Sequence, residues 1–118
     1  MSSVVDIRTN QVEDFTINQC RVCVRDNHLY FENQSIKLEP KVMQVLHCLY
    51  QFKDDVVSRD LLMSEVWKGR SVTDDSIGRC ISVLRKHFKA NALGIQIDTL
   101  AKKGYRLNIN DLSEADTE

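Results

Sequence analysis

The sequence contains few residues that interrupt secondary structure, and it has no long apolar run. One Pro and four Gly in 118 residues exclude collagen-like, Pro-rich and low-complexity chains. No unbroken apolar run is longer than three residues, whereas a membrane span needs about 20 and a signal peptide about 7–15. We therefore expect neither kind of segment here, and the length suits one domain with one core.

The cysteines and histidines also lack the patterns of a metal site or an enzyme. Cys20 and Cys23 have C-x-x-C spacing, but no second pair follows, and in a regular strand their sulfurs would point to opposite faces. Without a secretory signal, the four cysteines are expected to be reduced. Cys48 and Cys80 are predicted core residues. Cys20 and Cys23 remain candidates for an intermolecular or sensing disulfide in vitro. The three His are dispersed and no Gly-rich phosphate loop is present, so we predict no enzyme, no metal and no cofactor.

Basic charge is concentrated in the last third of the chain. The formal net charge is −1, but residues 78–107 hold seven basic residues and one acidic residue, which gives +6. Residues 1–77 hold nine basic and twelve acidic residues, and residues 108–118 hold four acidic and no basic residues. A polyanion site is therefore expected within residues 78–107, with a solvated charged face as the alternative. We interpret residues 110–118 as an acidic tail or linker.

The first third of the chain has a strand-like pattern. Residues 1–11 show no period and are expected to be frayed. Residues 12–38 are predicted to form an antiparallel β-meander, because apolar and polar residues alternate around Val22 and two-residue turns are expected at Asp26-Asn27 and Glu32-Asn33. Three helices are then predicted over residues 40–90.

Helix signals begin at Pro40, which suits the first turn of a helix. Apolar residues then recur at three- and four-residue spacing as far as Phe52, which predicts a buried helix ending at Asp54-Asp55. Ser58 is the expected N-cap of a short second helix, and Thr73 that of a third helix, which runs to about Ala90.

In residues 95–109, apolar and polar side chains alternate again on either side of a tight turn at Lys102-Lys103-Gly104. This pattern predicts a β-hairpin. The element order therefore predicts an α+β fold, a winged helix-turn-helix domain over residues 12–109.

The third helix is strongly two-sided on a wheel of about 100° per residue. Its core face is predicted to hold Ile77, Cys80, Ile81, Leu84 and Phe88. The opposite face holds Asp75, Arg79, Ser82 and Lys86, with Val83 and Arg85 on its flanks.

This outer face suits a DNA major groove. Arg79 and Lys86 can donate to guanine, Ser82 can donate or accept, and an exposed Val83 can meet a thymine methyl group. Arg85 is better placed for phosphate. In the alternative interpretation Arg79 pairs with Asp75 at i−4 and Ser82 is simply solvated.

At the hairpin turn, Lys102, Lys103 and Arg106 can reach phosphate or a narrow minor groove. Tyr105 shares a face with Leu107 and Ile109, so we predict that it belongs to the core.

From Ile36 to Leu107, several motifs together resemble the OmpR/PhoB-type winged-helix DNA-binding domain, and within that family the ToxR/CadC-like regulators. The matching segments are Leu38-Glu39-Pro40, Val57 to Leu62, Val66-Trp67, Val72-Thr73, Leu84-Arg85-Lys86 and Lys103 to Leu107. The chain departs from the pattern at Glu39, a poor N-cap where many relatives carry Thr. It departs again at Gly78, which either weakens the third helix or lets the backbone approach DNA closely.

The resemblance implies a bacterial, cytoplasmic regulator that binds double-stranded DNA in a sequence-specific way. Residues 73–90 would be the recognition helix in the major groove, and the wing turn 101–106 would lie on the minor groove or the backbone. It also implies tandem copies on DNA, contact of Lys68, Gly69, Arg70 and Ser71 with RNA polymerase, and, in a longer chain, an inner-membrane anchor. The alternative function is a winged helix that serves as a protein–protein interaction module.

Overall fold

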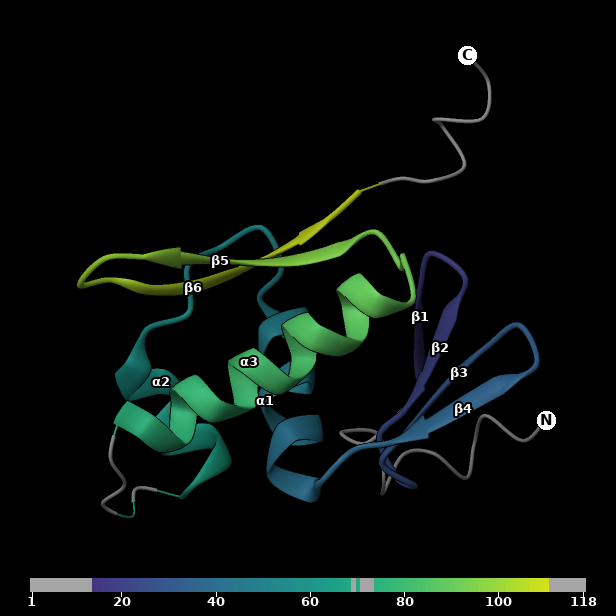
Figure 1. Ribbon diagram of the computed structural model, residues 1–118. Helices are drawn as coiled ribbons and strands as arrows, with labels where there is room; N and C mark the ends of the chain where they lie inside the picture. Colours follow the sequence, from purple (N-terminus) through teal and green to yellow (C-terminus); the bar gives the residue numbers. More distant parts are fainter. Residues whose placement is uncertain (1–13, 69, 71–73, 111–118) are drawn as a thin grey trace, which may run out of the picture.

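The computed structural model describes residues 14–68, 70 and 74–110, and Figure 1 shows its α+β architecture. The elements, in chain order, are β1 (Phe15–Ile17), β2 (Cys20–Cys23), β3 (His28–Phe31), β4 (Gln34–Lys37), α1 (Pro40–Gln51), α2 (Arg59–Val66), α3 (Asp74–Ala90), β5 (Ile95–Leu100) and β6 (Gly104–Ile109). The predicted order of meander, three helices and hairpin is confirmed. The expectations for residues 1–11, for Gly69 and Ser71, for the Thr73 cap and for the acidic tail fall outside the described residues.

The first four strands form an antiparallel sheet in the order β1-β2-β3-β4. Along β2, Cys20 and Val22 are buried and Arg21 is exposed, as alternation requires. Asn27 and Glu32 adopt positive φ angles of 60° and 53°, which places left-handed residues in the two predicted turns.

Helix α1 supplies much of the core. Its six buried residues are Val42, Met43, Val45, Leu46, Cys48 and Leu49. The helix ends at Gln51, before the Asp54-Asp55 end predicted from the sequence, and Phe52 is its C-cap and is 39% exposed. The prediction that Phe52 continues the buried stripe is therefore wrong, because the helical period ends before its side chain could face the core.

Helix α2 begins at the predicted cap. The Oγ atom of Ser58 accepts a hydrogen bond of 3.0 Å from the Leu61 amide, which satisfies one of the donors left open at a helix start. At the other end, Nζ of Lys41 in α1 donates to the Val66 carbonyl over 2.9 Å and so joins α1 to the last turn of α2.

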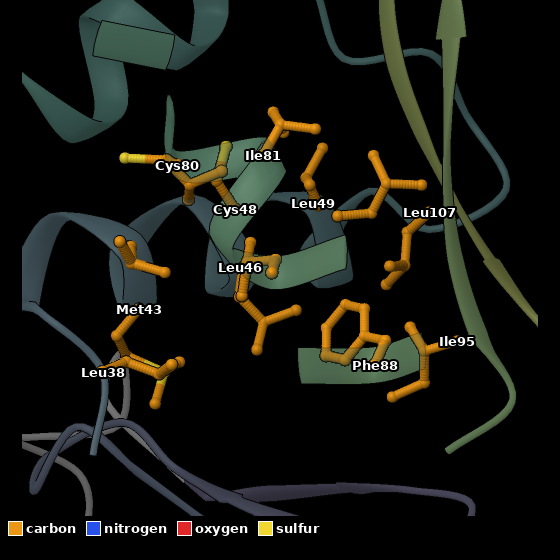
Figure 2. Close-up of a cluster of buried hydrophobic side chains, with 14 of the residues drawn as sticks. Leu38, Met43, Leu46, Cys48, Leu49, Cys80, Ile81, Phe88, Ile95 and Leu107 are labelled. Atoms are coloured by element: carbon orange, nitrogen blue, oxygen red, sulfur yellow. The ribbon is translucent and has the colours of Figure 1, made fainter. Parts of the chain in front are cut away.

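The core lies between α1, α3 and the hairpin. Figure 2 shows Leu46 and Leu49 of α1 near Ile81 and Phe88 of α3, with Leu107 of the hairpin beside them. Each of these five side chains is at most 2% exposed. Helix α3 is therefore fixed in place by apolar burial along its inner face.

The hairpin is also attached to the loop before α2. Val57 and Tyr105 exchange two backbone hydrogen bonds of 2.7 and 2.9 Å, and Gly104 next to them has φ 142°. A Cβ atom on Gly104 would lie 2.1 Å from the Val57 carbonyl oxygen. Only glycine permits this close approach of two backbones. Tyr105 is 7% exposed, so its predicted place in the core is confirmed.

A third attachment joins the meander to the base of the hairpin. The side-chain amide of Asn18, in the turn between β1 and β2, donates to the carbonyl oxygens of Leu93 (2.9 Å) and Asn110 (2.8 Å). The sheet, the end of α3 and the hairpin are thus held together by hydrogen bonds as well as by burial. No helix in the described part of the chain is long and apolar enough to cross a bilayer.

Candidate nucleic-acid interface

Helix α3 has the two faces predicted from the sequence. The inner face is 3% exposed or less at every predicted position, namely Ile77, Cys80, Ile81, Leu84 and Phe88. On the outer face Asp75, Arg79, Ser82 and Lys86 are all exposed. The sequence pattern was therefore sufficient to orient the helix.

One flanking residue differs from its prediction. Val83 is half-buried and packs against the core cluster, rather than standing exposed on the outer face. The reason is its position on the wheel, which is closer to the core face than that of Arg79. Only part of the Val83 side chain is left to meet a ligand.

Arg79 forms a bidentate ion pair with Glu39. Its Nη1 and Nη2 atoms donate to Oε1 and Oε2 of Glu39, each over 3.2 Å, and both side chains are more than 60% exposed. This pair raises the pKa of the Arg79 guanidinium, through the hydrogen bond first and the opposite charge second. The alternative pairing of Arg79 with Asp75 is therefore not the one found.

The sequence pattern did not reveal Glu39 as the partner of Arg79. It precedes α1 and is 40 positions from Arg79, so no helical spacing relates the two residues. The only sequence signal was negative: glutamate is a poor N-cap, and in the structure its side chain makes no capping hydrogen bond.

Arg85 ties α3 to the hairpin. Its Nε and Nη2 atoms donate to the Ile97 carbonyl over 3.0 and 2.6 Å, and Nη2 also donates to Oγ1 of Thr99 over 2.7 Å. The predicted flank position is confirmed, but much of the hydrogen-bonding capacity assigned to phosphate is used within the domain.

The two arginines frame the outer face of α3. Arg79 and Arg85 project about 120° apart around the helix axis, Arg79 towards the start of α1 and Arg85 towards β5. Ser82 and Lys86 lie between them and are exposed. The strip of α3 that holds Ser82 and Lys86, between the two arginines, is therefore accessible to a binding partner.

The hairpin turn presents two more cations. Lys102 and Lys103 are both exposed, and Lys102 has φ 64°, as a tight turn requires. Figure 1 shows the hairpin running alongside α3, with this turn at the same end of the view as the beginning of α3. A duplex lying along α3 would therefore also meet the turn.

Arg106 is placed differently from the two lysines. It is half-buried and pairs with Asp98 across the hairpin, with Nη2 3.4 Å from Oδ2. Asn108 also donates to the same Asp98 oxygen. The Asp98 carboxylate offsets the charge of Arg106, so Arg106 offers less to a polyanion than its sequence position suggested.

Between the end of α3 and β5 the surface is hollowed into a groove of about 570 Å³. Arg85 and Lys89 are among its lining residues, and Lys89 is exposed one turn beyond Arg85. Lys89 belongs to the basic segment of residues 78–107 but is not among the contact residues that the sequence predicts. Its spacing of four residues from Arg85, which places both side chains on the same side of the helix, is the sequence feature that could have indicated it.

The C-x-x-C cysteines are buried and belong to no group of potential metal ligands in the described part of the chain. Across residues 14–68, 70 and 74–110, no three His, Cys, Asp or Glu side chains are grouped so that they could hold a metal ion. Cys20 and Cys23 are both buried free thiols, and burial raises the pKa of Cys20 to about 11. Such thiols are poor nucleophiles at neutral pH. Cys48 and Cys80 are buried in the core as predicted.

Three helices followed by a hairpin against the third define a winged helix-turn-helix domain, and the comparisons with known proteins agree. Residues 33–107 match the family described as "Transcriptional regulatory protein, C terminal". The chain belongs to this family, and the resemblance to OmpR/PhoB-type and CadC-like regulators is confirmed. Its fold and family are those of the DNA-binding domains of transcription regulators.

Two longer regulators are similar in sequence. The transcriptional regulator HilA of Salmonella typhimurium is 30% identical over 96 residues, which cover 81% of this chain and 16% of HilA. The transcriptional activator CadC of Escherichia coli is 34% identical over 85 residues, which cover 70% of this chain and 17% of CadC. The chain thus spans about a sixth of the length of either relative.

Solved structures have the same fold. The DNA-binding domain of E. coli CadC superposes with a TM-score of 0.72 at 31% identity, covering 80% of this chain and 91% of that domain. The DNA-binding domain of Klebsiella pneumoniae RstA, solved in complex with the RstA box, has a TM-score of 0.64 at 21% identity, covering 80% and 95%. The second likeness supports the fold alone.

Proposed function

We propose that this domain binds double-stranded DNA in a sequence-specific way for a bacterial transcription regulator, with α3 in the major groove. The wing turn, residues 101–106, would lie on the adjacent minor groove or the backbone. The observation that carries the proposal is the row of Arg79, Ser82 and Lys86 on the outer face of α3, beside a hairpin turn with two exposed lysines. Family membership supports the same function.

The residues divide into base readers and backbone contacts. Arg79 and Lys86 would donate to guanine O6 and N7, and Ser82 would donate to or accept from a base edge. The exposed part of Val83 would touch a thymine methyl group. Lys102 and Lys103 would contact phosphates, with smaller contributions from Arg85 and Arg106, which are already engaged within the domain.

The charge of this surface disfavours the protein-interaction alternative. A winged helix that binds protein would expose apolar or mixed-sign residues on α3. Between the two framing arginines, the exposed side chains are Ser82, Lys86 and Lys89, which are polar or basic, and Asp75 in the first turn of α3, which is acidic. Basic residues therefore predominate there, and no large apolar side chain in the described part of α3 is exposed.

Three further proposals follow from the family. Lys68 and Arg70, which are exposed in the described part of the loop between α2 and α3, would contact RNA polymerase together with Gly69 and Ser71. Two copies would bind neighbouring half-sites. The domain would work in the cytoplasm, also where a longer chain is anchored in the inner membrane.

A binding selection with the purified domain on random duplexes tests the function. We expect an enriched motif whose half-site spacing reports tandem binding. Arg79→Ala should cost about 1–3 kcal/mol on the best site and relax the preference at one base pair. Lys103→Ala should weaken the affinity for all sequences alike. It should also reduce the slope of log affinity against log salt concentration by about one. Unchanged affinity for both variants at moderate salt would refute these assignments.

A further inference from the structure

We propose that Glu39 is a specificity-determining residue of the DNA-binding surface and that it acts by positioning Arg79. The inference rests on the proposed role of α3. Glu39 holds the Arg79 guanidinium in one orientation, which favours the correct sequence over others, and it also repels the DNA backbone, which weakens binding to every sequence.

Arg79 and Glu39 form a bidentate ion pair. Both terminal nitrogens of Arg79 reach the two carboxylate oxygens of Glu39 at 3.2 Å. Bidentate pairs of this kind fix the plane and direction of a guanidinium in a way that a single contact does not. An arginine on the outer face of α3 is thus held in place before any ligand arrives.

Backbone contacts around Glu39 fix the position from which its side chain extends. The Glu39 carbonyl accepts the first helical hydrogen bond, from Met43 over 3.0 Å, and Pro40 follows at the first helical position. Two residues on, Lys41 is bonded to the end of α2. The Glu39 side chain makes no capping bond and is therefore available to Arg79.

The pairing leaves Arg79 able to read a base. A guanidinium has five N–H donors, and the Glu39 contacts use one hydrogen on each terminal nitrogen. The Nε–H group and a neighbouring Nη hydrogen form a second edge. That edge can donate to guanine O6 and N7 while Glu39 stays bound.

The charge of Glu39 adds a second effect. A carboxylate beside the recognition helix repels phosphates on every sequence, so it weakens non-specific binding, which is mainly electrostatic. On the correct site, the aligned contact of Arg79 with its base offsets this loss. At a wrong base the aligned contact is missing, so discrimination at that base pair comes from the positioning of Arg79, while the repulsion lowers the affinity for every sequence.

The test measures the DNA affinity of wild type, Glu39→Gln, Arg79→Ala and the double variant. Each protein is titrated with the selected site and with duplexes that differ from it at one base pair, the one that Arg79→Ala no longer discriminates. We expect Glu39→Gln to lose roughly five- to tenfold of the discrimination at that base pair and to bind random-sequence duplex more tightly. In the Arg79→Ala background, Glu39→Gln should change the discrimination no further. Glu39→Asp, which keeps the charge, should restore part of it.

Glu32→Gln is the matched control, because it removes one exposed acid from the turn between β3 and β4. It should leave the discrimination unchanged. Thermal unfolding should be nearly unchanged in every single variant of the exposed pair.

Two results would overturn the inference alone. Glu39→Gln could keep full discrimination while Arg79→Ala loses it, or it could tighten the correct site and sharpen discrimination, which would mean that Glu39 only competes with DNA. If Arg79→Ala itself changes no base preference, both the role of Glu39 and the base-reading role of Arg79 fail.

Discussion

Arg85 donates two hydrogen bonds to the carbonyl oxygen of Ile97, from Nε at 3.0 Å and from Nη2 at 2.6 Å. The contact joins the outer flank of α3 to the first strand of the wing. A charged donor that forks onto one carbonyl is stronger than a neutral hydrogen bond. This side chain is therefore one of the contacts that hold the wing against α3.

We expect Arg85→Ala to lower the free energy of unfolding by about 1–3 kcal/mol and to weaken binding to all duplexes, because the wing loses its hydrogen bonds to the Arg85 side chain and keeps only its apolar packing against α3. Urea denaturation and binding titrations measure the two effects. Lys86→Ala is the control, since its exposed side chain should affect DNA affinity and leave stability within about 0.5 kcal/mol. Equal stability of both variants would contradict the role given to Arg85.

Gly104→Ala should destabilise the domain. A Cβ atom there would lie 2.1 Å from the Val57 carbonyl oxygen, so the two backbones would have to separate and break the bridge between Val57 and Tyr105. Backbone strain alone costs roughly 1–3 kcal/mol. A lower urea midpoint is the expected result, and a midpoint equal to that of wild type would show that the close approach is not required.

Gly78→Ala should have the opposite effect. Apart from its chain neighbours and the nearby backbone of α3 itself, no described atom lies within 4 Å of the position that a Cβ would take, and alanine favours a helix interior over glycine by up to ~1 kcal/mol. We expect a higher melting temperature. The affinity of the same variant for DNA then separates the two interpretations of this glycine: a loss means that the α3 backbone approaches DNA closely at Gly78, and an unchanged affinity means that the glycine only weakens the helix.

The stability of the domain should fall as the pH drops below about 6.5, partly because of His47. Burial lowers the pKa of His47 below its ordinary value, and its ring stacks on Phe15 with centroids 5.9 Å apart. The unfolded chain therefore takes up a proton, near pH 6.5, at a pH where the folded chain does not, and stability is lost as the pH falls.

The His47→Gln variant isolates this effect. It should lose less stability than wild type between pH 7.5 and 5.5, measured by urea denaturation at both values. His28→Gln is the control, because His28 lies on the sheet with a ring nitrogen near the Asp26 carbonyl. The same pH dependence in wild type and His47→Gln would exclude His47 as its source.

Local sequence patterns predicted the elements because each element has its own hydrophobic period, and α2 also has a recognisable cap. Ser58 is an example, since both its residue type and its place before Leu61 indicate an N-cap, and the structure has that bond. Phe52 was misplaced because periodicity does not indicate where a helix ends.

The side-chain contacts of the interface were less predictable. The pair of Arg79 with Glu39 and the bonds of Arg85 to the hairpin depend on how α1 and β5 pack against α3. No spacing along the chain contains that information. A helical wheel indicates which side of α3 faces outward. It does not indicate which basic residues of α3 already have a partner within the domain.

The backbone bridge between Val57 and Tyr105 has a thermodynamic consequence. It clamps the wing to the segment before α2, so helix and wing would meet a duplex as one rigid body rather than as parts that order on contact. The heat-capacity change on association should then correspond to the apolar area of the contact alone, without the excess that accompanies folding of a loop.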